Sequence, residues 1–327
     1  MVVLILVETK PTNTWLNILI AQLKKEQPNI DFRLWPEYGK PEEIEIVLTA
    51  WPPPGAMQKF PNLKLIMSLG VGVNRILEDP DLPDNIPIVR LVSESKRLQM
   101  IEYVTMAVLV FQRRLLEYQA LQRSQRWEYL PVQDATSFTV GILGLGDLGL
   151  TVAKKLKLIG FPIRGWSRTP KIVAGVECFH GQEQFKLFLN KCRAIVCLLP
   201  VTPQTEGILC QDTFSALPPG AYLINVGRGK HLIEPDLLTT LDSGQIASAC
   251  LDVFDTEPLP VDHPFWSDPR IIVTPHIAAR GRSDEIAAAI LDTINCSRMG
   301  RPLKYAIDRR CCLLYTSDAA DEWVRVG

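Results

Sequence analysis

The sequence predicts an α/β protein with two doubly wound domains, each built on its own parallel sheet. Three observations support this fold class. Short apolar runs alternate with helical patterns along most of the chain, which is typical of parallel strands joined by crossover helices. These runs form two series, separated by a long amphipathic stretch at 99–123. The length of 327 residues is sufficient for two domains.

The first series begins at the N-terminus. Strands are expected at 2–7, 44–50 and 64–69, and a helix at 13–25. In the amphipathic stretch at 99–123 apolar side chains recur at helical spacing, so we expect one long helix there. Because no Gly- or Ser-rich linker is present, this helix is expected to make the crossing between the domains near residues 95–105.

The second series has six predicted strands, the number that a complete dinucleotide-binding sheet requires. The strands are expected at 139–143, 163–166, 194–199, 221–226, 247–253 and 271–274. Helices are expected at 147–159, 182–191, 211–217, 234–243 and 282–298. The alternation of strands and helices predicts a Rossmann-like domain.

Composition excludes several classes of protein. The formal net charge of −1 gives no basic excess for nucleic-acid binding. No apolar run approaches the roughly 20 residues of a membrane helix, and the N-terminus is typical of a first strand rather than a signal peptide. The eight cysteines are scattered, which favours no metal site and a reducing compartment. We therefore expect a cytoplasmic protein.

The segment at 311–327 differs from the rest of the chain. It has neither helical period nor capping pattern, and it looks like a translated sequencing adapter. We expect it to be a non-native tail, and a ragged native terminus is the alternative. Neither interpretation bears on function.

A glycine-rich turn follows the strand at 139–143. Gly144, Gly146 and Gly149 form G-x-G-x-x-G between a strand and a helix. In that context the glycines permit a tight turn, close approach to a pyrophosphate and close packing of helix on strand. The predicted cofactor contacts in this turn are Gly144, Leu145, Gly146, Asp147, Leu148 and Gly149.

The choice of cofactor depends on the residues after the next strand. A site for NAD usually has an acidic side chain there for the ribose hydroxyls. This chain has Ser167, Arg168, Thr169 and Lys171 instead. Arg168 can pair with a 2′-phosphate and Ser167 can donate a hydrogen bond to it, which favours NADPH over NADH. The alternative is that Arg168 and Lys171 are solvated loop cations.

Three candidate catalytic side chains follow later strands, at the edge where open α/β sheets bind ligands. Arg228 stands between two glycines, and its guanidinium suits a carboxylate beside a ketone oxygen. Glu257 lies in a Pro-ended acidic loop, and His276 follows Pro275. His276 is the expected general acid, with His231 as its main competitor. His180 and His263 are expected to face solvent.

Taken together, the motifs resemble one family. They are G-x-G-x-x-G at 144–149, N-V-G-R-G at 225–229, L-D-V-F-D-T-E-P-L at 251–259 and T-P-H-I-A-A at 274–279. In this order they resemble the D-isomer-specific 2-hydroxyacid dehydrogenase family over nearly all of 1–310. W-S-R-T-P at 166–170 is similar to its NADPH-using subgroup. The resemblance implies reduction of small 2-oxo acids, glyoxylate to glycolate and hydroxypyruvate to D-glycerate.

The resemblance also implies roles for single residues. Arg228 would bind the substrate carboxylate and polarise its ketone. His276 would protonate the developing alkoxide, and Glu257 would orient His276. Asp252 would meet the nicotinamide carboxamide. Leu199, Pro200, Val226 and Gly227 would be further cofactor contacts.

On the substrate side, the resemblance points to Gly70, Val71 and Gly72, whose backbone N–H groups would hold the substrate carboxylate. Trp51 would form a wall of the pocket. The chain departs from the resembling enzymes at 280–282, where two arginines could favour more acidic substrates.

The resemblance further implies a domain division and a homodimer formed through the cofactor domains. Residues 1–100 with 284–310 would form a flavodoxin-like substrate domain, and 101–283 the dinucleotide-binding domain. Two alternatives stay open at this point. One is an NAD-dependent D-2-hydroxyacid dehydrogenase with another substrate, and the other is a dinucleotide-sensing protein without catalysis.

Overall fold

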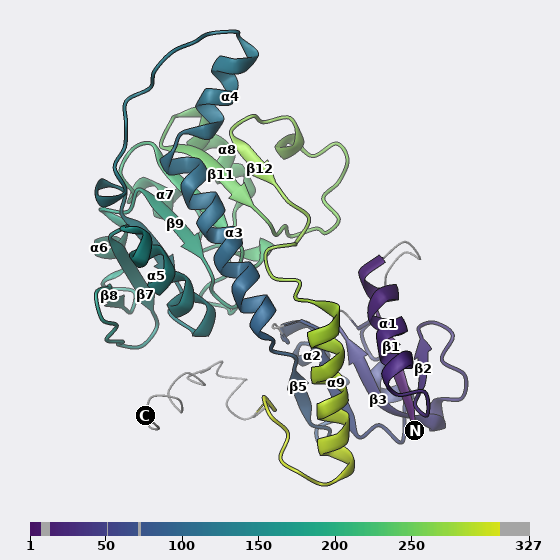
Figure 1. Cartoon of the computed structure of the whole chain (residues 1–327). Coiled ribbons are helices and arrows are strands. Elements are labelled where there is room, and N and C mark those ends of the chain that lie inside the picture. Colours follow the sequence, from purple (N-terminus) through teal and green to yellow (C-terminus); the bar gives the residue numbers. More distant parts are fainter. Residues whose placement is uncertain (8–13, 51, 71–72, 308–327) are drawn as a thin grey trace. The chain divides into compact units, whose positions relative to one another are not determined.

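The computed structural model describes residues 1–7, 14–50, 52–70 and 73–307. Trp51, Val71, Gly72 and the segment 311–327 lie outside the described residues. The chain divides into two compact units, drawn in Figure 1. Within the described residues, the first comprises Met1–Lys96 and 281–307, and the second comprises Arg97–Arg280.

The first unit is built on a five-stranded sheet in the order β2-β1-β3-β4-β5, with all neighbours parallel. The strands are β1 Val2–Leu6, β2 Asp31–Leu34, β3 Ile44–Thr49, β4 Leu65–Ser68 and β5 Ile88–Arg90. This is the flavodoxin-like order of a doubly wound sheet. The sequence predicts β1, β3 and β4 but not the edge strands β2 and β5. Both are short: polar residues alternate with apolar ones in β2, and β5 has only two apolar residues before Arg90.

Two helices far apart in sequence lie side by side against this sheet (Figure 1). They are α1 Thr14–Glu26 and α9 Ser283–Arg298. Their fully buried side chains, such as Leu19 and Leu23 of α1 and Ile290 of α9, belong to one core cluster. The helix α2 Asn74–Leu77 and two 3-10 turns, Pro41–Glu43 and Met57–Lys59, complete the described elements of this unit.

The second unit contains a seven-stranded parallel sheet in the order β12-β11-β10-β9-β6-β7-β8. The strands are β6 Val140–Leu143, β7 Ile163–Ser167, β8 Glu177–His180, β9 Ala194–Cys197, β10 Ala221–Asn225, β11 Ile246–Leu251 and β12 Ile271–Val273. The prediction of six strands is wrong by one. The missed strand, β8, is an edge strand in which only Phe179 is fully buried, so it lacks an apolar run.

Helices flank this sheet as well. They are α3 Glu94–Gln112, α4 Leu115–Arg123, α5 Asp147–Ile159, α6 Phe185–Leu189, α7 Gln211–Ser215 and α8 Glu234–Asp242. The single helix expected at 99–123 is wrong in two respects. The helix begins earlier, and it is interrupted before α4, where Arg114 has a left-handed φ of 57°. The boundary between the two units lies within the first turn of α3.

The register of the second sheet brings the predicted site residues to one edge. Asn225 pairs with Leu251, and Leu251 with Val273, so the segments that follow β10, β11 and β12 leave the sheet side by side. The glycine turn leaves β6 at the same edge because the strands are parallel. Within the part of the chain that the structure describes, every helix is too short or too polar to cross a membrane.

Candidate active site

The Arg228 loop follows β10 and approaches the backbone of the next loop closely. A methyl group on Gly229 would lie 1.9 Å from the carbonyl carbon of Phe254, so only glycine allows this approach. Asn225, the fully buried last residue of β10, holds the loop through two hydrogen bonds. Its Oδ1 accepts from Gly227 N at 3.2 Å, and its Nδ2 donates to Arg228 O at 3.1 Å. The glycines on either side of Arg228 therefore have a structural reason that the sequence alone did not reveal.

His231, the competing histidine, supports this loop from its inner side. The ring is completely buried, and its Nδ1 accepts a hydrogen bond from Arg228 N at 3.0 Å. Nε2 lies 3.1 Å from the carbonyl oxygen of Pro200 and donates to it, because a carbonyl only accepts. Burial lowers the pKa of His231, which favours the neutral ring. Both ring nitrogens are used within the protein, so His231 is a structural residue.

Glu257 and His276 form a close pair in the loops after β11 and β12. His276 Nδ1 lies 2.8 Å from Glu257 Oε2, and the second carboxylate oxygen accepts from Phe254 N at 3.0 Å. Side-chain exposure is 37% for His276 and 22% for Glu257, so the pair is partly open to solvent. Burial alone would raise the pKa of Glu257. The pKa is nevertheless lowered, because three neighbours outweigh the effect of burial. They are His276, through its hydrogen bond and charge, the N–H of Phe254, and the charge of Arg228.

The backbone of His276 has an uncommon conformation. Its φ is +54°, in the left-handed region that non-glycine residues seldom adopt. The His276 N–H donates to Asp252 O at 2.9 Å, which ties the loop to the end of β11. Backbone outliers of this kind are held in place by their surroundings and concentrate at functional sites.

Asp252 is the residue that holds this loop. Its carboxylate is 1% exposed. Oδ1 accepts from Thr274 Oγ1 at 2.6 Å and from Ile277 N at 2.8 Å, and Oδ2 accepts from Ala278 N at 2.9 Å. A carboxylate has about four acceptor positions, so these three bonds leave room for one further donor. The expected contact of Asp252 with the nicotinamide carboxamide stays a prediction.

The glycine turn after β6 fits a pyrophosphate. Gly144 has a φ of +100°, and a methyl group on Gly149 would lie 1.8 Å from Gly144 O, so both positions require glycine. A methyl group on Gly146 would meet no atom within 4 Å. The space beside Gly146 is therefore open at the point where α5 begins, and helix N-termini attract anions there.

The residues predicted to distinguish NADPH from NADH end β7. Ser167 is 7% exposed, and its hydroxyl donates to Thr169 O at 2.8 Å. Arg168 is exposed in the following bend, and Lys171 is half-buried. No acidic residue occurs between Ser167 and Lys171. Without an acid at this point, nothing in the bend repels a 2′-phosphate.

The remaining predicted cofactor contacts lie at the same edge. Leu199 and Val226 are buried, and Pro200 accepts the hydrogen bond from His231. A methyl group on Gly227 would lie 3.0 Å from His231 Nδ1 and 3.2 Å from Leu199 O. Gly227 therefore lets the segments after β9 and β10 approach each other.

The prediction that His263 faces solvent is wrong. Its side chain is only 17% exposed, and its Nε2 lies 3.1 Å from Glu234 Oε2. The side chain of His180, at the end of β8, is 38% exposed. Neither histidine is bonded to the predicted catalytic side chains in any contact that the structure describes.

Two residues near the cofactor edge escaped prediction. Arg97 in α3 forms an ion pair with Asp147, with Nη2 3.1 Å from Oδ2, so it offsets the charge of this acid at the start of α5. Tyr103 in α3 places its hydroxyl 2.6 Å from Thr274 Oγ1. Both lie on the helix before the sheet, and no spacing in the sequence connects them with the strand ends.

In the first unit, Gly70 lies two residues after the end of β4. Lys96, 3% exposed, donates to Leu69 O at 2.8 Å and to Leu91 O at 3.1 Å, and so anchors the residue before Gly70. Burial lowers the pKa of Lys96 to about 8. Arg282 pairs with Asp284, Nη2 to Oδ2 at 2.6 Å, so a neighbouring acid offsets its charge.

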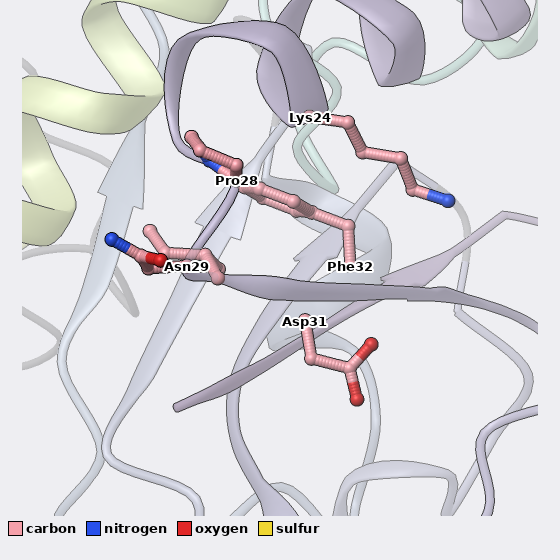
Figure 2. Close-up of a pocket in the computed structure, with 6 residues that line it drawn as sticks. Lys24, Pro28, Asn29, Asp31 and Phe32 are labelled. Atoms are coloured by element: carbon pink, nitrogen blue, oxygen red, sulfur yellow. The ribbon is translucent and has the colours of Figure 1, made fainter.

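A surface pocket of this unit lies elsewhere (Figure 2). It is lined by Lys24, Pro28, Asn29, Ile30, Asp31 and Phe32, where the chain passes from α1 into β2. This is the amino-terminal edge of the parallel sheet, whereas Gly70 follows the carboxyl end of β4. The pocket therefore belongs to the opposite edge from the predicted substrate segment.

Comparison with known proteins identifies the family. The profile of the D-isomer specific 2-hydroxyacid dehydrogenase NAD-binding domain matches residues 105–278, more than half of the chain. The chain belongs to the D-isomer-specific 2-hydroxyacid dehydrogenase family. This dehydrogenase is 46% identical over 283 residues to glyoxylate/hydroxypyruvate reductase A of Serratia proteamaculans. The aligned region covers 83% of this chain and 90% of the relative.

Solved structures of this family agree with the fold. A D-isomer specific 2-hydroxyacid dehydrogenase family protein from Klebsiella pneumoniae matches with a TM-score of 0.89 and 36% identity, covering 95% of this chain and 98% of that protein. An NADPH-dependent glyoxylate/hydroxypyruvate reductase from Sinorhizobium meliloti, solved with NADP and sulfate, matches with a TM-score of 0.86 and 32% identity, covering 94% and 98%. The predicted fold class of two parallel-sheet α/β domains is confirmed.

Proposed function

We propose that this dehydrogenase reduces small 2-oxo acids with NADPH, glyoxylate to glycolate and hydroxypyruvate to D-glycerate. The observation that carries the proposal is the pairing of His276 with Glu257 at the edge of a dinucleotide-binding sheet, 2.8 Å apart, with Arg228 near enough to lower the pKa of Glu257. The relatives from Serratia and Sinorhizobium carry the names of reductases acting on these two acids. Arg228, Glu257 and His276 are the proposed catalytic residues.

NADPH, when bound, supplies the hydride that reduces the ketone. Arg228 binds the substrate carboxylate and polarises the ketone oxygen, for which a guanidinium fork is well suited. Glu257 binds Nδ1 of His276, so Nε2 is the nitrogen that gives its proton to the developing alkoxide. The ionised Glu257 stabilises the protonated imidazole before transfer and keeps the ring in one orientation.

The cofactor site is proposed on the fit of the loops after β6 and β7. The open space at Gly146 and the start of α5 suit the pyrophosphate, with Leu145, Asp147 and Leu148 around it. Ser167, Arg168, Thr169 and Lys171 would surround the 2′-phosphate. The buried Asp252 would accept from the carboxamide with its remaining acceptor position.

The substrate carboxylate is proposed to bind to the backbone N–H groups of Gly70, Val71 and Gly72, and Trp51 is proposed to form a wall of the pocket. This assigns substrate binding to the unit formed by residues 1–96 and 281–307, and dinucleotide binding to 97–280. The support in the structure is the position of Gly70 after β4, since open α/β sheets bind ligands beyond the carboxyl ends of their strands.

A steady-state assay with glyoxylate and hydroxypyruvate, each with NADPH and with NADH, tests this function. We expect activity with both acids and a kcat/KM at least about tenfold higher with NADPH, the size of one charge-assisted contact. The matched variant Arg168→Gln should lower kcat/KM for NADPH and leave that for NADH unchanged. A preference of the unaltered enzyme for NADH would contradict the cofactor assignment.

The enzyme is further proposed to be a homodimer formed through the second unit. Apolar side chains are exposed on α3 and α4, where Met106 is 45% and Leu115 44% exposed, and in the segment after α4, where Trp127 is 91% and Tyr129 88% exposed. Exposed apolar clusters of this kind favour association. Light scattering during gel filtration should give twice the chain mass, and a monomer would contradict the proposal.

We also propose that the enzyme works in the cytoplasm. The cysteines within the described residues, namely 178, 192, 197, 210, 250 and 296, are all free thiols. Free thiols are typical of a reducing compartment.

A further inference from the structure

A row of hydrogen-bonded hydroxyl groups connects α3 to the loop that carries His276. Tyr103 OH lies 2.6 Å from Thr274 Oγ1, which in turn donates to Asp252 Oδ1 at 2.6 Å. At the other end, Tyr103 OH lies 3.3 Å from the thiol of Cys250. Tyr103 is 8% exposed, Cys250 is completely buried and Thr274 is half-buried, so water has little access to the Cys250–Tyr103 end of the row.

The direction of the hydrogen bonds in this row follows from the Asp252 carboxylate at its end. A carboxylate only accepts, so the single hydroxyl proton of Thr274 is used toward Asp252. Thr274 Oγ1 must then accept from Tyr103 OH. Burial raises the pKa of Tyr103 above its usual range and that of Cys250 to about 11, so both groups keep their protons at neutral pH. The row therefore runs in one direction, from Cys250 through Tyr103 and Thr274 to Asp252.

Asp252 connects this row of hydrogen bonds to the loop of His276, the proposed proton donor. Its carboxylate accepts from Ile277 N and Ala278 N, immediately after His276, and its backbone oxygen accepts from His276 N. These three bonds lie on both sides of His276, whose φ of +54° is left-handed. The αL conformation is costly for a non-glycine residue, so loosening Asp252 would let the loop relax and move the imidazole.

We propose that Tyr103 and Thr274 are positioning residues that hold His276 for proton transfer by way of Asp252. The inference rests on the proposed function, in which His276 is the proton donor. Tyr103 donates to Thr274 Oγ1, whose own proton is donated to Asp252. Hydrogen bonds aligned in such a row strengthen one another. A displacement of about 1 Å at a catalytic group can lower the rate by about a hundredfold.

The central experiment compares Tyr103→Phe with Tyr222→Phe. Tyr222 is a matched control because it is a second buried tyrosine of the same unit, 4% exposed and stacked on Phe111, with no described bond to the His276 loop. We expect Tyr103→Phe to lower kcat about tenfold and to increase the solvent deuterium isotope effect on kcat, because proton transfer becomes slower. Tyr222→Phe should change neither quantity.

A second measurement does not depend on catalysis. Amide hydrogen exchange of Ile277 and Ala278 in the cofactor-free protein should become about tenfold faster in Tyr103→Phe, while the amides of β6 and β10 keep their rates. Faster exchange throughout the unit would mean general destabilisation and would overturn the proposal. Unchanged exchange at both amides would overturn it as well.

Variants of Thr274 complete the test. Thr274→Val removes the hydroxyl at nearly constant volume and should lower kcat at least as much as Tyr103→Phe, whereas Thr274→Ser should retain most of the activity. The double variant Tyr103→Phe/Thr274→Val should be no worse than Thr274→Val alone, because both changes interrupt one row. Additive losses would contradict a shared path.

The two proposals fail in distinguishable ways. If the unaltered enzyme does not reduce a 2-oxo acid with NADPH, the proposed function is wrong, and the exchange experiment still reports whether Tyr103 holds the loop. If the enzyme is active but Tyr103→Phe retains full kcat and normal exchange, the function stands and the positioning role is wrong.

Discussion

Two loops at the same sheet edge each contain a histidine, and the protein uses them in opposite ways. His231 in the loop after β10 is fully buried, with both ring nitrogens bonded to backbone groups. His276 in the loop after β12 has a side chain that is 37% exposed, and its Nδ1 lies 2.8 Å from Oε2 of Glu257. The partner of each nitrogen, rather than the histidine itself, decides which ring can give a proton to a substrate.

The largest expected effect comes from removing the exposed ring. We expect His276→Ala to lower kcat about a thousandfold, within the usual range for loss of a general acid. Binding of NADPH, followed by quenching of tryptophan fluorescence, should be unchanged. A loss of turnover smaller than about tenfold would show that another group supplies the proton.

The second effect concerns the partner of that ring. Glu257→Gln keeps the shape of the side chain but removes the charge, and we expect kcat to fall about a hundredfold. Steady-state kinetics at pH 7 measures this loss, and Asp255→Asn, a neighbouring exposed acid, serves as the control. Equal losses in both variants would contradict a specific role for Glu257.

Glu257 also makes a pH-dependent contribution to stability. Its folded pKa is lowered from 4.5, so its contribution to the free energy of unfolding is present above that value and is lost as pH falls through the folded pKa. Denaturant unfolding at pH 6 and at pH 4 should therefore show a smaller decrease in Glu257→Gln than in the unaltered enzyme. An equal decrease would mean that the carboxylate is not stabilised in the folded state.

The smallest effect on catalysis should come from the buried ring, and its main effect should be on stability. His231→Gln is expected to lower the free energy of unfolding by about 1–3 kcal/mol at pH 7.5, the range for an impaired buried hydrogen bond. Burial lowers the folded pKa of His231 below 6.5. The free energy of unfolding of the unaltered protein therefore decreases as pH falls below that value. Denaturant unfolding at pH 7.5 and 5.5 should show a weaker pH dependence in the variant. A loss of activity as large as that of His276→Ala would reverse the assignment of the two rings.

The contrast between these histidines also shows what the sequence could reveal. The position of a residue after a strand identified Arg228, Glu257 and His276, because parallel strands bring their carboxyl ends to one edge. The sequence could not show that His231 is buried, since both histidines follow strand-like runs and their ring partners come from distant segments. Tyr103 was missed for the same reason, because its contact with Thr274 joins residues 171 positions apart.

The fold was predictable to a similar degree. Strands buried on both faces, such as β6 and β10, have continuous apolar sequences and were located nearly to the residue. The edge strands were missed because none has a long apolar run. Polar side chains interrupt β2 and β8, and β5 is only three residues long. The interruption before α4 depends on the left-handed Arg114, which no local residue preference indicates.

The helix α9 has a consequence for the order in which the chain acquires structure during synthesis. Ile286, Ile290 and Ile294 fill the core of the first unit, so this unit stays incomplete until α9 has left the ribosome. Among the described residues, the core clusters of the second unit draw on side chains within 97–280 alone. Domains fold as units as they emerge, so the second unit can mature before the first, although the first unit begins earlier in the chain. Until α9 arrives, the apolar side of α1 is the surface that a chaperone would have to protect.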